Sequence, residues 1–295
     1  MAKLHKIMAT ALILHGLAQA PAGTQEHGEE ALSADPREHT ARMRTGNENF
    51  VRLHGRQYRL VHSKGQQPSL IVMQCADSRD DLVTQAELPP GYVFAMGTNA
   101  GNIINPKEPS LLANVAYHLK HLHGKNRAYV VMGHYGCGGI KGLDELEHLE
   151  PEIAGHLRLA LPAKEFVERH LRNRKLDVGK ETRHRMVVEA NVLAQIRNLM
   201  SIKQVRRAVE LRQLSVIPVI SDINTGELHF GLPTLQQYGM LEHAKAEFGI
   251  QKWLQSQHRL QDHQLARQGP PRPESRRMPP ATRASSRRNP VFRRG

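Results

Sequence analysis

Ser69-Leu-Ile-Val-Met-Gln74 is a short apolar run, bounded by Pro68 and followed at once by Cys75-Ala-Asp77-Ser-Arg79. Its length and content are typical of a buried strand in a parallel sheet. Two similar runs follow at 92–96 and 128–132, each ending at a glycine, and the segment 110–123 between them has helical spacing of its apolar residues. Buried strands that alternate with helices predict an α/β fold with a mainly parallel central β-sheet flanked by helices.

The remaining segments fit the same fold. Residues 36–53 have a helical pattern, and a long charged helical region covers about 164–212. Two short strands, 216–220 and 227–230, flank a turn at Asn224-Thr-Gly226,. Pro218 predicts that the first of these strands lies near an edge of the sheet, because proline cannot donate a hydrogen bond to a neighbouring strand.

Residues suited to chemistry follow three of the predicted strands. Cys75, the glycine-containing segment 97–101 and His134-Tyr-Gly-Cys137 all come directly after a strand. In parallel sheets, sites form at the carboxyl ends of the strands. We therefore expect these three segments to converge at one edge of the sheet.

The chain has only two cysteines, Cys75 and Cys137. Their number alone allows a disulfide, a metal site or two unrelated buried thiols. Together with His134 they form a Cys2His set, which suits tetrahedral zinc and leaves the fourth position free for water. Glycines at 136, 138 and 139 supply the tight turn that the H-x-x-C spacing needs. We expect Zn²⁺ as the cofactor.

Neither C-x-D-x-R nor H-x-x-C is specific alone, but together, each after a predicted strand, they resemble the signature of the β-class carbonic anhydrases. The resemblance runs from about residue 65 to 230. It includes four further segments: Gly65-Gln-Gln-Pro68, Asn99-Ala-Gly-Asn102, Glu189-Ala-Asn-Val192 and Asp222-Ile-Asn-Thr-Gly226.

The resemblance implies a lyase that hydrates carbon dioxide reversibly to bicarbonate and a proton by zinc-bound hydroxide. Asp77 would accept a hydrogen bond from the hydroxide, and Arg79 would keep Asp77 ionised through a charge-assisted pair. Gln66 would donate a hydrogen bond to a substrate oxygen, and Gly101 would let the backbone approach the substrate closely. Some relatives close the site at lower pH by placing the residue that corresponds to Asp77 on the zinc, so the resemblance makes Asp77 a candidate fourth ligand in a closed state.

Two positions depart from the family pattern. Thr98 stands where many relatives have an arginine, which in one subgroup helps to hold a regulatory bicarbonate. The resemblance therefore does not extend to that form of regulation. Asp80 stands where relatives have an aliphatic residue, and its carboxylate either competes for Arg79 or faces solvent.

The family also predicts a homo-oligomer. Its substrate cleft lies at a subunit interface, and N-terminal helices embrace the partner. We expect a homodimer as the smallest functional unit, or a tetramer built from two dimers, with segment 36–53 as the arm.

The two ends of the chain differ in composition from the predicted domain, 36–262. Residues 1–22 have a basic start, an apolar stretch and A-x-A patterns, which favour a signal peptide and an exported, periplasmic or secreted protein,. A short amphipathic helix of a cytoplasmic protein is the alternative. Residues 23–35 are predicted to be a linker. No stretch of the sequence is long and apolar enough for a transmembrane segment,.

The net charge of +13 comes mostly from the C-terminal end, since residues 267–295 hold nine arginines and a single acid, Glu274. The segment 263–295 is rich in proline and arginine and predicts a disordered tail. It raises the alternative of a module that binds nucleic acid or other anions. The tail has one aromatic residue, Phe292, and no recognisable fold, so we expect no specific nucleic acid partner,. A hydrolase of COS or CS2 with the same zinc ligands is the second alternative.

Overall fold

The computed structural model describes residues 36–62, 68–79, 81–89, 91–95, 98–122 and 127–253. The predicted signal peptide 1–22, the linker 23–35 and the tail 263–295 lie outside these residues. Cleavage of the signal peptide, export and disorder of the tail therefore stay predictions. Within the described residues, no helix has the length and apolarity needed to cross a membrane.

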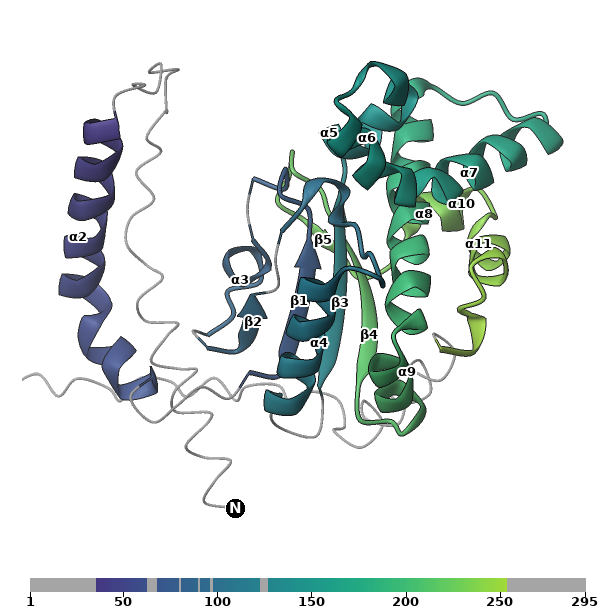
Figure 1. Cartoon of the computed structure of the whole chain (residues 1–295). Coiled ribbons are helices and arrows are strands. Elements are labelled where there is room, and N and C mark those ends of the chain that lie inside the picture. Colours follow the sequence, from purple (N-terminus) through teal and green to yellow (C-terminus); the bar gives the residue numbers. More distant parts are fainter. Residues whose placement is uncertain are drawn as a thin grey trace, which may run out of the picture. The chain divides into compact units, whose positions relative to one another are not determined.

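A five-stranded sheet organises the domain (Figure 1). Its strands are β1 (Leu70–Gln74), β2 (Val93–Ala95), β3 (Ala128–His134), β4 (Ser215–Ser221) and β5 (Leu228–His229), in the order β2-β1-β3-β4-β5. The pairs β1–β2, β1–β3 and β3–β4 are parallel, whereas β4–β5 is antiparallel. This confirms the expected mainly parallel α/β sheet.

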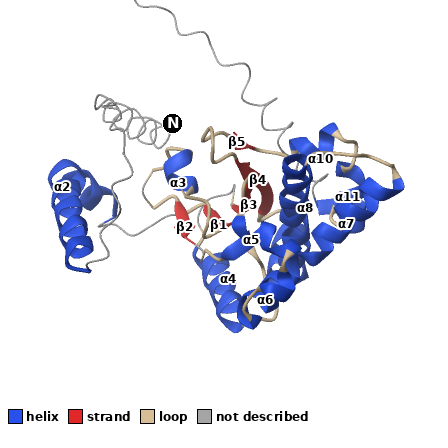
Figure 2. Ribbon diagram, turned by 90° about the horizontal axis from the view of Figure 1, so that it is seen from above, coloured by secondary structure: helices blue, strands red, loops and turns tan. Residues whose placement is uncertain are grey.

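Helices lie on both faces of this sheet. Their bounds are α2 Pro36–His62, α3 Leu82–Gln85, α4 Pro109–His121, α5 Gly138–Lys141, α6 Pro151–Leu157, α7 Leu161–Asn173, α8 Lys180–Ser201, α9 Lys203–Glu210, α10 Pro233–Gln237 and α11 Leu241–Glu247. Short 3-10 turns are η1 Ala100–Asn102, η2 Gly142–Asp144, η3 Leu146–His148 and η4 Arg158–Ala160. Helices α4 and α8 cover one face, and α3 lies on the other (Figure 2).

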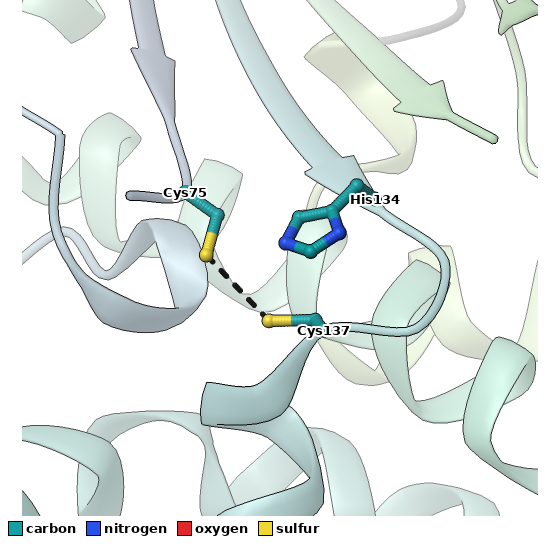
Figure 3. Close-up of side chains that lie close together, drawn as sticks. All are labelled: Cys75, His134 and Cys137. Atoms are coloured by element: carbon teal, nitrogen blue, oxygen red, sulfur yellow. Dashed lines mark hydrogen bonds between the residues drawn. The ribbon is translucent and has the colours of Figure 1, made fainter. Parts of the chain in front are cut away.

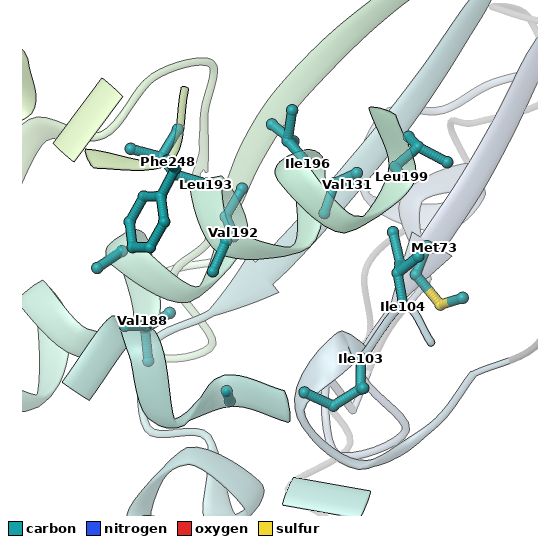
Figure 4. Packing of buried hydrophobic residues seen from close by; sticks show 14 of the residues in the cluster. Met73, Ile103, Ile104, Val131, Val188, Val192, Leu193, Ile196, Leu199 and Phe248 are labelled. Atoms are coloured by element: carbon teal, nitrogen blue, oxygen red, sulfur yellow. The ribbon is translucent and has the colours of Figure 1, made fainter. Parts of the chain in front are cut away.

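The core lies mainly between the sheet and α8, which is buried along most of its length (Figure 4). Val188, Val192 and Ile196 of this helix pack in one cluster with residues of β1 and β3. Gly133 permits the close approach, since a Cβ atom there would lie 2.9 Å from Cγ2 of Val192. The missing side chain thus lets α8 pack directly on the end of β3.

The structure corrects three details of the sequence prediction. Helix α2 continues to residue 62 instead of ending near 53, because no proline or paired glycine interrupts it. The region 164–212 is three helices, not one, and breaks at 174–179 and again at Ile202. Strand β3 includes Gly133 and His134, because both pair with β4.

The expectation that Pro218 lies near an edge of the sheet is confirmed for the part of β4 around this residue. Strand β5 pairs with β4 only at Ile220 and Ser221. On the β5 side, Pro218 therefore faces no partner strand among the described residues, so its missing N–H costs no ladder hydrogen bond.

An ion cluster ties the segment after α5 to two long helices. Arg183 of α8 donates to both carboxylate oxygens of Asp144, at 3.0 and 3.1 Å, and to Glu168 of α7. Lys164 of α7 lies 2.7 Å from Asp144. Hydrogen bonds from Arg183 and then Lys164 lower the pKa of Asp144 to about 2.

Replacing Asp144 with Asn should lower the free energy of unfolding at neutral pH by about 1 kcal/mol. The pKa shift alone would give more, but this half-exposed carboxylate is partly screened by water. A depressed folded-state pKa stabilises the protein above the unfolded-state pKa, near 4, and this stabilisation is lost as the pH falls toward 2. The difference between parent and D144N in urea unfolding should therefore shrink below about pH 4.

Glu242→Gln is the matched control. Glu242 pairs with Lys245 at 2.7 Å on the surface, so its loss should change the free energy of unfolding by less than about 0.5 kcal/mol,. A D144N protein as stable as the parent at pH 7 would show that the cluster is energetically neutral.

Candidate metal centre

Cys75, His134 and Cys137 converge at the carboxyl edge of the sheet, as the sequence predicts (Figure 3). Their ligand atoms all lie within 4.8 Å of one another, and all three residues are buried. The register of the sheet causes this convergence. Gln74 at the end of β1 pairs with Met132, so Cys75 emerges beside the last residues of β3.

His134 presents one ring nitrogen to the cluster. Its Nδ1 lies 3.0 Å from the carbonyl oxygen of Tyr135. A carbonyl oxygen can only accept, so Nδ1 carries the proton and Nε2 keeps a free lone pair. Nε2 is buried and has no hydrogen-bond partner within the described structure. A buried, unpaired imidazole nitrogen beside two sulfurs fits a zinc ligand whose tautomer is fixed by its other nitrogen.

The two sulfur atoms lie 3.6 Å apart. The hydrogen bond from Cys137 lowers the pKa of Cys75, and the same contact, together with burial, raises the pKa of Cys137. The contact thus favours ionisation of Cys75 over ionisation of Cys137. A dication binds both sulfurs as thiolates, so its binding releases any proton that they carry.

Backbone amides also point at Cys75. Its sulfur accepts from the N–H groups of Asp77, at 3.3 Å, and Gly101, at 3.2 Å. Gly139 makes room for the second contact, because a Cβ atom there would lie 2.9 Å from the nitrogen of Gly101. Such amide contacts stabilise negative charge on the sulfur.

Asp77 and Arg79 form an ion pair beside this cluster. Nη1 of Arg79 lies 3.1 Å from Oδ1 of Asp77. The other carboxylate oxygen accepts from the N–H of Gly138 at 2.7 Å. Asp77 therefore bridges the two segments that carry the cysteines, and its side chain is 40% exposed.

The comparisons with known proteins agree with this geometry. A carbonic anhydrase family model matches residues 70–228. A carbonic anhydrase of Synechococcus elongatus is 31% identical over 174 residues, 56% of this chain and 61% of that protein. The chain belongs to the β-class carbonic anhydrase family.

Two further relatives of this carbonic anhydrase family agree with that assignment. A carbonic anhydrase of Pseudomonas aeruginosa is 31% identical over 170 residues, 55% of this chain and 73% of that protein. A structure of tetrameric β-carbonic anhydrases from Sordaria macrospora matches with a TM-score of 0.56 and 26% identity, over 66% of this chain and 96% of that one. The match to the Synechococcus carbonic anhydrase spans about three fifths of that protein's length.

Not every expected site residue lies in the described part of the chain. Gln66 and Asp80 lie outside the described residues, so their roles stay predictions. Gly101 lies at the site, with its N–H directed at Cys75. Thr98 is exposed.

Sequence reasoning assigned no role to Glu189 or Asn191, although both belong to a motif shared with the carbonic anhydrases. Glu189 is fully buried and accepts from the hydroxyl of Tyr135 at 2.6 Å and from the N–H of Thr234 at 2.9 Å. It thereby anchors the turn between His134 and Cys137. Asn191 donates to the carbonyl oxygen of Gly101 at 2.9 Å. Two polar residues inside the mostly apolar run 186–194 of α8 were the available signal,.

We expect purified protein to contain one zinc ion per chain, measured by atomic emission against protein concentration. His134→Ala, Cys75→Ala and Cys137→Ala should each lower this value to near zero after dialysis, because each removes one of three protein ligands. His148→Ala is the control and should keep its zinc, since His148 is an exposed histidine on η3. A Cys75–Cys137 disulfide in freshly isolated protein would contradict the assignment.

Proposed function

We propose that this protein is a zinc-dependent carbonic anhydrase that interconverts carbon dioxide and bicarbonate. The convergence of Cys75, His134 and Cys137, with the Nε2 lone pair of His134 unpaired, carries the proposal. The family assignment supports the reaction, and the donor set supports the metal, because two thiolates and one imidazole are preferred zinc ligands. Zinc held there would supply a water molecule that ionises near neutral pH, the nucleophile for carbon dioxide.

Asp77 is suited to orient that nucleophile. Its carboxylate is fixed by Arg79 and by the N–H of Gly138, so its free lone pairs have one preferred direction. A carboxylate accepts hydrogen bonds only, and it would align the O–H bond of an attacking water. Asp77 is also held off the ligand set by these two contacts. The arrangement supports an open site, with Asp77 as a catalytic residue and not as a zinc ligand.

Arg79 keeps this carboxylate in place at a conformational cost. Its φ angle is +62°, a region that residues other than glycine seldom adopt,. Its guanidinium reaches both the side chain and the carbonyl oxygen of Asp77. Strained backbone persists where surrounding contacts enforce it, and such sites are often functional. The pair thus supports an Asp–Arg dyad in the reaction.

Asp77→Asn should keep one zinc per chain and lower kcat for carbon dioxide hydration at least about tenfold. The amide is nearly isosteric with the carboxylate, but one of its two groups donates instead of accepting. Stopped-flow measurement with a pH indicator, together with zinc analysis of the same sample, checks both parts.

Asp81→Asn is the matched control, because it makes the same chemical change four residues away. Asp81 caps α3 by accepting from the N–H of Thr84, a role that asparagine also fills,. Its kcat should equal that of the parent. A D77N protein with the parent rate would show that the dyad is only structural. A zinc-loaded parent protein that is inert towards carbon dioxide but consumes COS or CS2 would change the substrate and keep the metal chemistry.

We also propose that the functional unit is a homodimer or a tetramer. Helix α2 exposes the apolar side chains of Met43, Phe50 and Val51, with 68%, 43% and 57% of their surface accessible. Positions 43, 50 and 51 fall on one side of a helix with 3.6 residues per turn. Such a strip favours burial against another surface. The description of the Sordaria macrospora enzymes as tetrameric supports association within the family.

Phe50→Asp should shift the protein from dimer or larger towards monomer in sedimentation velocity, because a buried unpaired charge opposes association. Thr45→Asp places the same charge on the opposite side of α2 and should leave the sedimentation coefficient unchanged. A parent protein that sediments as a fully active monomer would refute the oligomer.

A further inference from the structure

We propose that His156 is a positioning residue for the metal centre, acting on the sulfur of Cys75 through the peptide bond between Ala100 and Gly101. This inference rests on the proposed zinc site. It assigns a role to a residue that lies 81 positions after Cys75 in the sequence and outside every motif of the family resemblance.

The series of hydrogen bonds from His156 to Cys75 begins with a bond from the His156 ring to the backbone. Nε2 of His156 lies 3.0 Å from the carbonyl oxygen of Ala100. Because a carbonyl oxygen only accepts, Nε2 must carry the proton and donate it. The tautomer of His156 is therefore set by this contact.

The second contact leaves the same peptide group on its other side. The N–H of Gly101 donates to the sulfur of Cys75 at 3.2 Å. The carbonyl of Ala100 and the N–H of Gly101 belong to one planar, conjugated unit. Hydrogen bonds in such a chain polarise one another, so donation to the carbonyl makes the N–H a stronger donor. His156 thus draws electron density from the sulfur over two hydrogen bonds.

The adjoining peptide group, between Gly101 and Asn102, is fixed from the side of α8. Asn191 donates to the carbonyl oxygen of Gly101 at 2.9 Å, and Gln195 donates to Oδ1 of Asn191 at 2.8 Å. Both amides are fully buried. They hold Gly101 at a φ angle of +76°, a conformation that glycine adopts without strain,. The direction of the Gly101 N–H is consequently defined before any metal binds.

Helix α6 brings His156 to this place. The next residue, Leu157, is buried and lies against the same loop, since a Cβ atom on Gly101 would be 3.5 Å from Cδ2 of Leu157. His156 itself is only partly buried. Its ring can be replaced without opening the core. His156 is therefore the best position at which to test this series of hydrogen bonds.

The test uses the cobalt-substituted protein and its thiolate-to-cobalt charge-transfer band. A hydrogen bond to a thiolate stabilises the sulfur lone pairs and raises the energy of this transition, as expected for a contact that tunes a metal ligand. His156→Glu and His156→Gln form the decisive pair, because their side chains have the same shape and only glutamine donates to a carbonyl oxygen. We expect a shift to longer wavelength in H156E and a parent-like band in H156Q.

His156→Ala should show the same shift as H156E, with one cobalt per chain and a melting temperature close to that of the parent. A parent-like band in both H156E and H156A, at full cobalt content, would overturn the proposal. Because the band reports on the sulfur and not on turnover, it separates this inference from the proposed reaction. A shifted band in variants of a protein that is inert towards carbon dioxide would support the role of His156 and reject the proposed reaction.

Discussion

The parallel pairing of β1 with β3 is the constraint on which the metal centre depends. Five consecutive residue pairs, from Leu70 with Ala128 to Gln74 with Met132, fix the relative height of the two strands. A shift of one residue would turn the side chains that follow to opposite faces of the sheet. Cys75 and His134 meet because this register is held by side chains buried on both strands.

Around this register, the centre is supported by backbone groups more than by side chains. Two backbone N–H groups donate hydrogen bonds to the sulfur of Cys75, and a backbone carbonyl oxygen fixes the tautomer of His134. Backbone donors are positioned by the fold itself and need no side-chain ordering when a ligand binds. Only glycine fits at 139, where α5 approaches the Gly101 amide so closely that a side chain would displace it.

The sequence predicted the parts of this structure that are local. Each strand before a ligand was recognisable as an apolar run. The two cysteines, and the histidine three residues before Cys137, pointed to one ligand set. Features that depend on contacts between segments distant in the sequence could not be predicted. Strand β3 continues through His134 because β4 offers partners there, and no pattern near residue 134 encodes that pairing. The roles of Asn191 and His156 likewise depend on backbone atoms some 90 and 56 residues away.

Gly133 shows how these contacts limit the changes that the protein can accept during evolution. A methyl group there would meet Val192, so a substitution would push α8 away from the sheet. The same helix carries Glu189 and Asn191, which reach the two loops that hold the ligands. A substitution at residue 133 would therefore displace both ligand-bearing loops at the metal centre, through Glu189 and through Asn191. We expect lineages that change residue 133 to do so only together with a smaller residue on α8.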